Sequence, residues 1–193
     1  MTVFLKNEAR VMGVDDGPYR RGSEKTRIIM TVMRMNGMIE GFLGGSIGTD
    51  GNDSSRVIAK ILEGSRFMDQ VRCIISDGAC LGGFNVLDMD DLYERVCIPV
   101  ITASDKRPDP NLMERTLIDL FPDGKERYKM ISNHTPHVLN LRDGTCYIRE
   151  EGITREEAFN IIERCTFQGR TPEPIRISHM IASLTAEGSE ENG

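Results

Sequence analysis

Three acidic side chains follow apolar, strand-like segments and precede glycine-containing turns. Asp15 and Asp16 come after residues 10–14, and Asp77 follows closely on residues 71–75. Side chains at such positions project from the edge of a sheet, where the ligands of α/β folds gather. Carboxylates brought together there repel one another unless a cation lies between them, and oxygen ligands suit Mg²⁺ or Mn²⁺. We therefore predict a magnesium or manganese site at this edge.

A nearby loop contains further carboxylates that could complete the site. Asp50 and Asp53 lie in the run Gly48-Thr-Asp-Gly-Asn-Asp53. Two ions about 4 Å apart can stabilise both oxygens of an in-line phosphoryl displacement, and such a pair needs several carboxylates. Aspartate is also a favoured turn and helix-capping residue, so the same acids have a purely structural interpretation. Both interpretations stay open at this point.

The charge balance restricts the way in which nucleic acid could be bound. The 193 residues contain 30 acidic and 24 basic side chains, which give a formal charge of −6. Binding to phosphates over the whole surface is therefore disfavoured, and local clusters must supply the cations. The best cluster comprises Arg20, Arg21, Lys25 and Arg27, and Lys106-Arg107 is a shorter one. The structural alternative is a solvated turn and strand edge. The five cysteines lack C-x-x-C spacing, which argues against a disulfide framework and a structural zinc site.

The elements that must position these residues alternate along the chain. We predict strands over 10–14, 27–35 and 38–47, with an Asn-Gly hairpin at residues 36–37, and then a helix begun by Asp53. Further strands are expected over 71–75, 98–102, 129–141 and 146–149, and helices over 86–96, 109–120, 154–162 and 175–186. This order predicts a mixed sheet with helices on both faces.

No linker or internal repeat divides the chain, so we predict one domain over residues 1–193 with a frayed tail from about residue 187. There is no uninterrupted run of about 18 apolar residues and no secretory signal pattern at the N-terminus. These features predict a cytoplasmic protein without a membrane span.

Several segments resemble endonuclease V, a family with the ribonuclease H-like fold. The resemblance is carried by Gly13-Val-Asp15, by Ile75-Ser-Asp-Gly78 and by the strand that begins Ile98-Pro-Val and ends at Lys106. It extends to Gly152-Ile-Thr-Arg-Glu-Glu-Ala158 and to the segment from Pro172 to His179, and it spans residues 10–186. An α/β, ribonuclease H-like mixed sheet is the fold that it implies.

A closer resemblance is to an uncharacterised, mostly archaeal relative of endonuclease V. It rests on four motifs: Asp15-Asp-Gly-Pro18, Asp50-Gly-Asn-Asp53, Gly82-Gly-Phe-Asn85 and Pro172-Glu-Pro-Ile-Arg176. Because that relative has no assigned activity, the closer resemblance implies a fold more securely than a reaction.

The resemblance to endonuclease V implies roles for particular residues. Asp15 and Asp77 would be metal ligands, His179 would lie near the metal and Lys106 would approach a phosphate. Asp16 has no direct counterpart, and we include it as a second candidate ligand. Endonuclease V has a Pro-Tyr-Ile-Pro wedge and a metal-binding glutamate where this chain reads Gly44 to Asp53. Asp50 or Asp53 would have to replace that glutamate.

Two other residues are candidate nucleic-acid contacts. Asn85 is first a capping residue and second a contact to a base or phosphate. Arg176 lies one helical turn before His179 and is as well suited to pairing with Glu173 as to binding phosphate.

The leading hypothesis is a Mg²⁺- or Mn²⁺-dependent nuclease that hydrolyses DNA or RNA phosphodiesters. Its alternative is a non-catalytic nucleic-acid-binding or adaptor protein on the same fold. A third possibility is phosphotransfer or hydrolysis of a small molecule, because the fold does not fix the function.

Overall fold

The first three strands form an antiparallel meander. β1 (Arg10–Asp16) pairs with β2 (Lys25–Arg34), which pairs with β3 (Ile39–Gly48). The predicted hairpin joins β2 to β3. Gly37 has a φ of +93°, which glycine adopts readily, and Asn36 Oδ1 accepts a hydrogen bond from the backbone NH two residues later.

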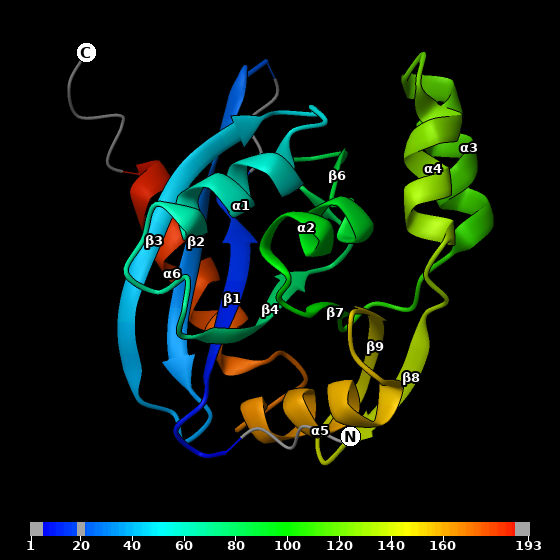
Figure 1. Ribbon diagram of the computed structural model, residues 1–193. Coiled ribbons are helices and arrows are strands. Elements are labelled where there is room, and N and C mark those ends of the chain that lie inside the picture. The colour runs from blue at the N-terminus through cyan, green and yellow to red at the C-terminus, as the bar shows by residue number, and fades with distance from the viewer. Residues whose placement is uncertain (1–5, 19–21, 188–193) are drawn as a thin grey trace.

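The structure is a computed structural model that describes residues 6–18 and 22–187 (Figure 1). The other strands are β4 (Val71–Asp77), β5 (Cys80–Leu81), β6 (Asn85–Val86), β7 (Val100–Ser104), β8 (His137–Leu141) and β9 (Gly144–Glu151). The helices are α1 (Ser54–Glu63), α2 (Met89–Val96), α3 (Pro110–Leu120), α4 (Gly124–Ser132), α5 (Arg155–Cys165) and α6 (Glu173–Glu187).

Seven strands form one mixed sheet in the order β3-β2-β1-β4-β7-β9-β8. The central strands β1, β4 and β7 are parallel, and the strands on both sides of them are antiparallel to their neighbours. The carboxyl ends of the three central strands therefore lie at the same edge of the sheet. This edge is where the sequence predicts the site.

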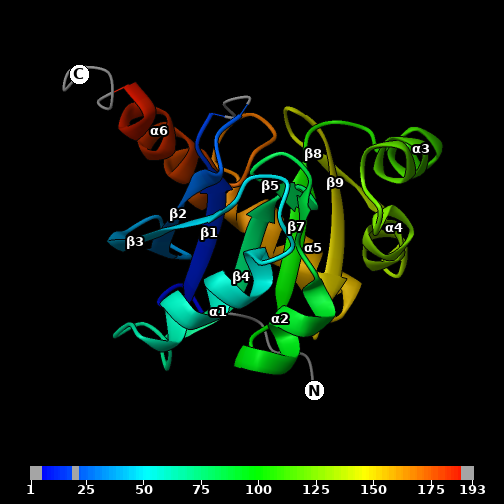
Figure 2. The ribbon, with the colours of Figure 1, turned by 90° about the horizontal axis from the view of Figure 1, so that it is seen from above.

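Helices cover both faces of the sheet, as predicted (Figure 2). Ile58 and Leu62 of α1 and Leu92 of α2 belong to the core on one face. Ile161 and Ile162 of α5 belong to the core on the other face, where α6 also packs against β1 and β2. Because the central strands are buried on both faces, their residues are almost continuously apolar.

α3 and α4 form an additional pair beside the sheet, at the right of Figure 1. Leu117 and Ile131 are buried in a small core that these helices share with Val86. Arg127 of α4 is also buried. Its Nη1 donates hydrogen bonds to the backbone carbonyls of Asp50, Gly51 and Phe84, so that α4 is attached to the loops above the sheet.

Two predicted elements are wrong in part. The strand expected over 129–141 is helix α4 up to Ser132, and only His137–Leu141 is a strand. The helix expected from Val86 begins at Met89 because Asp88 is its N-cap, and Asn85–Val86 pairs instead with Cys80–Leu81.

No helix within the described ranges combines the length and the apolar character that a membrane span requires.

Candidate metal centre

Asp15, Asp16 and Asp77 lie at the shared carboxyl edge of β1 and β4. The two strands are in parallel register with Val14 opposite Ser76, and the acids occupy the next positions along each strand. The register therefore brings Asp15 next to Asp77. Figure 2 shows β1 and β4 side by side, with the N-terminal part of α6 against them.

Asp15 is the most buried of these acids, with an exposed fraction of 3%. Its Oδ1 accepts a hydrogen bond from Asp16 N at 2.8 Å, and its Oδ2 is hydrogen-bonded to His179 Nδ1 at 2.9 Å. Burial, and after it the charge of Asp77, raise the pKa of Asp15 to about 7. The Asp15 carboxylate therefore lies where negative charge is costly unless a cation is near.

The other two acids respond to the same surroundings. Asp16 Oδ2 accepts a hydrogen bond from Gly82 N at 3.0 Å, while burial raises the pKa of Asp16. Desolvation by the surrounding protein raises the pKa of Asp77, and the Asp16 charge raises it too. His179 and Lys106 lower it. Five of the predicted site residues thus lie close enough together for one to affect the ionisation of another: Asp15, Asp16, Asp77, Lys106 and His179.

His179 is held at the edge by close packing of α6 against β1. A Cβ on Gly13 would lie 2.3 Å from the carbonyl carbon of Pro174, so only glycine fits there. Ser178 Oγ donates to Gly13 O at 3.0 Å and is hydrogen-bonded to Thr31 Oγ1 at 2.8 Å. These buried contacts fix the turn of α6 that presents His179, whose side chain is 65% exposed.

Asp50 and Asp53 use their carboxylates in the loop itself. Asp50 has a φ of +54°, and its Oδ1 accepts a hydrogen bond from Phe84 N at 2.9 Å. Asp53 Oδ1 accepts hydrogen bonds from Gly48 N and from Asn85 Nδ2 at 3.0 and 2.7 Å. These bonds match the structural interpretation that the sequence left open.

The prediction that Asn85 contacts nucleic acid is wrong. Its side chain has an exposed fraction of 0%, and Nδ2 donates to Gly48 O as well as to Asp53. Its Oδ1 accepts a hydrogen bond from Ser54 N in the first turn of α1. Asn85 is therefore a capping residue of a helix that precedes it in the chain, and no surface is left for a base or phosphate.

The predicted phosphate contacts differ in their surroundings. Lys106 is exposed and lies close enough to Asp77 to lower its pKa. Arg176 forms two hydrogen bonds with the Glu173 carboxylate, at 2.8 and 2.6 Å, which is the pairing that the sequence offered as an alternative. Arg20 and Arg21 lie outside the described residues.

Asp105 is an acid of this edge that sequence reasoning missed. It directly follows β7, the third parallel strand, and its charge raises the pKa of Asp77. Its carboxylate pairs with Arg170 at 3.0 Å. Its position after an apolar strand is the same signal that pointed to Asp15 and Asp77.

A different group of side chains meets the distance requirement for three metal ligands. Single ligand atoms of Asp90, His134 and Glu151 lie within 4.8 Å of one another. Glu151 pairs with Val100 at the start of β7, whereas Asp77 pairs with Ala103 near its end. The group therefore lies away from the acids at the carboxyl edge. Within it, His134 Nε2 lies 3.1 Å from Asp90 Oδ1.

Comparisons with known proteins agree with this architecture. A protein of Methanothermobacter thermautotrophicus described as a UPF0215 protein is 36% identical over 181 residues, or 93% of this chain and 88% of that protein. The crystal structure of a protein of unknown function from Archaeoglobus fulgidus has a TM-score of 0.81 at 31% identity, with 92% of this chain and 98% of that chain covered.

More distant structures share the fold. Endonuclease V of Ciona intestinalis, in complex with a DNA that contains inosine, has a TM-score of 0.65 at 13% identity, and the match covers 94% of this chain and 87% of that one. The predicted ribonuclease H-like fold is thereby confirmed. The sequence model of the family described as endonuclease dU matches residues 7–186. This match and the archaeal relatives together show that the chain belongs to the endonuclease dU family.

Proposed function

We propose that this protein is a divalent-metal-dependent nuclease that hydrolyses phosphodiester bonds in nucleic acid. The observation that carries the proposal is the convergence of Asp15 and Asp77 at the carboxyl ends of adjacent parallel strands, with His179 hydrogen-bonded to Asp15. The likeness of the fold to endonuclease V supports the same reaction class.

The donor atoms fit a Mg²⁺ or Mn²⁺ ion. Asp15 and Asp77 supply carboxylate oxygens, Asp16 supplies a third carboxylate beside them, and hard divalent cations prefer oxygen ligands. The burial of Asp15 and the mutual repulsion of the acids favour a bound cation in this place. When bound, the ion would act as a Lewis acid on the phosphate and lower the pKa of a water molecule.

The residues of the chain would orient the reacting groups. The Asp16 NH and His179 Nδ1 both bond Asp15, which fixes the direction of its carboxylate. The exposed His179 imidazole can exchange a proton with solvent or with a leaving oxygen. Lys106, which is exposed beside Asp77, would attract the phosphate and orient it toward the acids.

The related proteins suggest which nucleic acid strands to test as substrates. The family description, endonuclease dU, suggests DNA strands that contain deoxyuridine. The Ciona intestinalis complex suggests strands that contain inosine. Undamaged DNA and RNA of the same sequence complete the set.

The decisive experiment is cleavage of these labelled strands in Mg²⁺ or Mn²⁺ by wild-type protein and by Asp77→Asn. We expect the wild type to cut at least one strand and Asp77→Asn to lose at least about a hundredfold in rate, because one carboxylate ligand is gone. Asp69→Asn is the matched control, since Asp69 is an exposed aspartate on the surface. Full cleavage by Asp77→Asn would show that the assignment of the site is wrong.

The alternative is a nucleic-acid-binding protein without catalysis. It is favoured by one observation: Asp50 and Asp53 each use one carboxylate oxygen in loop hydrogen bonds, which have a structural role in the loop where the family glutamate would lie. Strand binding by the folded wild-type protein with no cleavage in either metal would establish this alternative.

A further inference from the structure

A cavity opens directly beside the candidate metal centre. It has a volume of about 700 Å³ and lies between the α3–α4 pair and the loops that follow β4 and β7. Gly78, the residue after Asp77, lines it together with Lys106. A group held in this cavity would therefore lie near the acids of the candidate metal centre.

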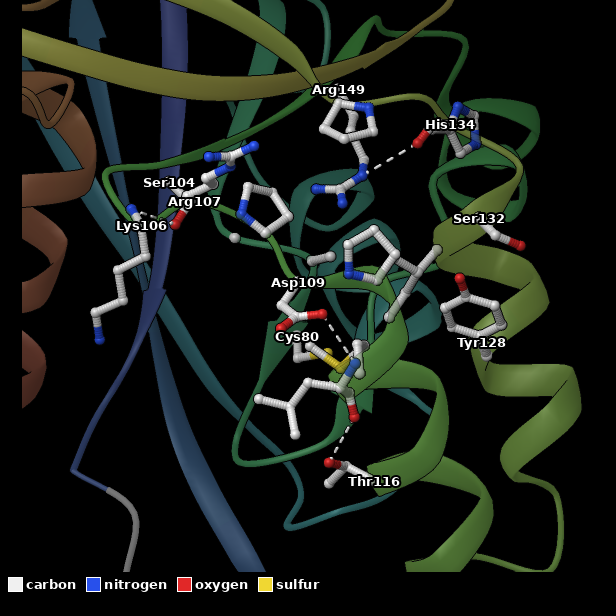
Figure 3. A pocket seen from close by; sticks show the side chains of 18 of the residues that line it. Cys80, Ser104, Lys106, Arg107, Asp109, Thr116, Tyr128, Ser132, His134 and Arg149 are labelled. Carbon is white, nitrogen blue, oxygen red and sulfur yellow. Dashed lines mark hydrogen bonds between the residues drawn. The ribbon is translucent and has the colours of Figure 1, made fainter.

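Arg149 of β9 lines the cavity and is almost fully buried, with an exposed fraction of 9%. Its Nε donates a hydrogen bond to His134 O at 3.1 Å. Among residues 6–18 and 22–187 it has no carboxylate partner, and its Nη1 and Nη2 donate no hydrogen bond. Figure 3 shows Arg149, Lys106 and Tyr128, which come from different elements, arranged around the same space.

The other buried arginine shows what a structural guanidinium looks like in this protein. Arg127 has an exposed fraction of 7%, and it donates to three backbone carbonyls and to the Asp123 carboxylate. It also stacks on the Phe121 ring at 4.2 Å. Within the described part of the chain Arg149 lacks such partners, and its amino groups are not fully buried, so they are open to the cavity. The unpaired amino groups of Arg149 are therefore suited to an acceptor that comes from outside the chain.

The rest of the wall is suited to a flat, largely apolar ligand. Phe84, Met113, Tyr128 and Ile131 line the cavity, and the rings of Phe84 and Tyr128 offer surfaces on which a base can pack. Lys106 and Arg107, which are exposed at the same cavity, are suited to the phosphates of a strand. A nucleobase needs apolar faces, and donors at the edge that carries its carbonyl oxygens, and the aromatic rings and Arg149 offer both.

We propose that this cavity receives one base of a nucleic acid strand and that Arg149 selects a base with a carbonyl oxygen at the edge facing it. This inference rests on the proposed function in one respect, namely that the protein acts on nucleic acid. A guanidinium has five N–H donors and no acceptor, so it bonds a carbonyl and rejects an amino group. Uracil has a carbonyl at position 4 where cytosine has an amino group, and the cavity should therefore prefer uracil to cytosine.

The test is equilibrium binding of short labelled DNA strands without divalent metal, so that no strand is cut. Three strands differ at one position, which holds deoxyuridine, deoxycytidine or an abasic site. We expect wild-type protein to bind the deoxyuridine strand about tenfold more tightly than the other two. Arg149→Met is expected to abolish this preference, and Arg149→Lys to reduce it, because a lysine lacks the two-pronged donor geometry.

Arg107→Met is the matched control, since Arg107 is exposed at the same cavity. It is expected to weaken the binding of all three strands alike and to keep the preference. Thermal unfolding checks the fold: Arg127→Met is expected to lower the melting temperature markedly and Arg149→Met far less. Equal weakening of all three strands by Arg149→Met would mean that Arg149 binds a phosphate and would overturn the inference, as would the absence of a preference in the wild type.

Cleavage of the same three strands in Mn²⁺ separates this inference from the proposed function. If the protein cleaves but shows no deoxyuridine preference in binding, the proposed nuclease function stands and the proposal that the cavity receives a base is rejected. If binding shows a preference that depends on Arg149 but no strand is cleaved, the proposal that the cavity receives a base stands and the proposed nuclease function is rejected.

Discussion

Asp15 combines burial with a position beside other acids. Its carboxylate is enclosed between β1, β4 and α6, and Asp16 and Asp77 surround it with like charge. Of the charged groups that shift the pKa of Asp15, His179 alone lowers it, and its effect is the smallest. The ionised Asp15 is thus costly to the stability of the protein, and the proposed cation would offset that cost.

The pH dependence of stability follows from this arrangement. The pKa of Asp15 is about 7 in the folded protein against 3.8 as a reference, so the folded state binds more protons than the unfolded state between these values. The free energy of unfolding of the metal-free protein should therefore fall as the pH rises from about 4 to about 7, and Asp15 adds no further change above that. Asp16 and Asp77 act with the same sign, because their pKa values are also raised.

Asp15→Asn tests this at the level of one side chain. We expect the variant to unfold with a shallower decline across that pH range and to be about 2 kcal/mol more stable than wild type at about pH 8. Urea denaturation at several pH values without divalent metal measures both quantities. Asp69→Asn should follow the wild-type curve, and an unchanged slope in Asp15→Asn would show that Asp15 is ionised at no cost.

At the scale of elements, the contact between α6 and β1 positions the histidine. The helix approaches the strand so closely that its backbone occupies the space of a Gly13 side chain. Ser178 joins the helix to β1 and β2 through buried hydrogen bonds. Any group that separates these two elements moves His179 away from Asp15 without touching either residue.

Gly13→Ala is the smallest change that does this. A methyl group would lie 2.3 Å from backbone carbon, where no flexible side chain can give way, so α6 must shift. We expect a loss of about 1–3 kcal/mol in the free energy of unfolding. We also expect the cleavage rate to fall by more than the fraction of unfolded protein accounts for. The control is Gly64→Ala, whose Cβ would approach nothing closer than 3.4 Å. Wild-type stability and cleavage in Gly13→Ala would contradict the proposed role of this contact.

The elements that could be predicted from the sequence are those in which the pattern of apolar residues determines the fold. β-Branched residues and the Asn-Gly turn predicted the meander, and the capping box at Thr154 and Glu157 correctly predicted the start of α5. α4 escaped prediction because its buried positions are Gly124, Arg127 and Ile131. Their spacing is helical, but only Ile131 is apolar, so the pattern indicates no buried helix face.

The pattern of residues alone predicted the candidate site only where strand ends supply its residues, and His179 of α6 was predicted from the resemblance to endonuclease V. Parallel neighbours bring Asp15 next to Asp77 whatever else surrounds them, and the sequence shows both strands. Asn85 and Arg149 could not be assigned in this way. Their surroundings depend on how distant loops and α3–α4 pack, and an isolated polar residue in a strand does not reveal whether it has a partner.

At the scale of the whole molecule, the net charge is unfavourable for the proposed binding of nucleic acid. A formal charge of −6 and an edge of several carboxylates repel phosphates, so binding must rest on a few local cations and on the cavity. Lys106 and Arg107 both line the cavity, and Lys106 also lies near Asp77. The affinity for a nucleic acid strand should therefore depend less on salt concentration than is usual for nucleic-acid-binding proteins.

The salt dependence of strand binding measures how many cations take part. Each phosphate contact adds about 0.7 to the slope of log affinity against log salt concentration for a single strand, so we expect a total slope of only about −2. Lys106→Ala should reduce the slope by about 0.7 and weaken binding equally for every base, because it removes a phosphate contact and no base contact. Lys60→Ala, an exposed lysine near the end of α1, should leave the slope unchanged. A steep slope that Lys106→Ala does not alter would place the phosphate contacts elsewhere on the surface.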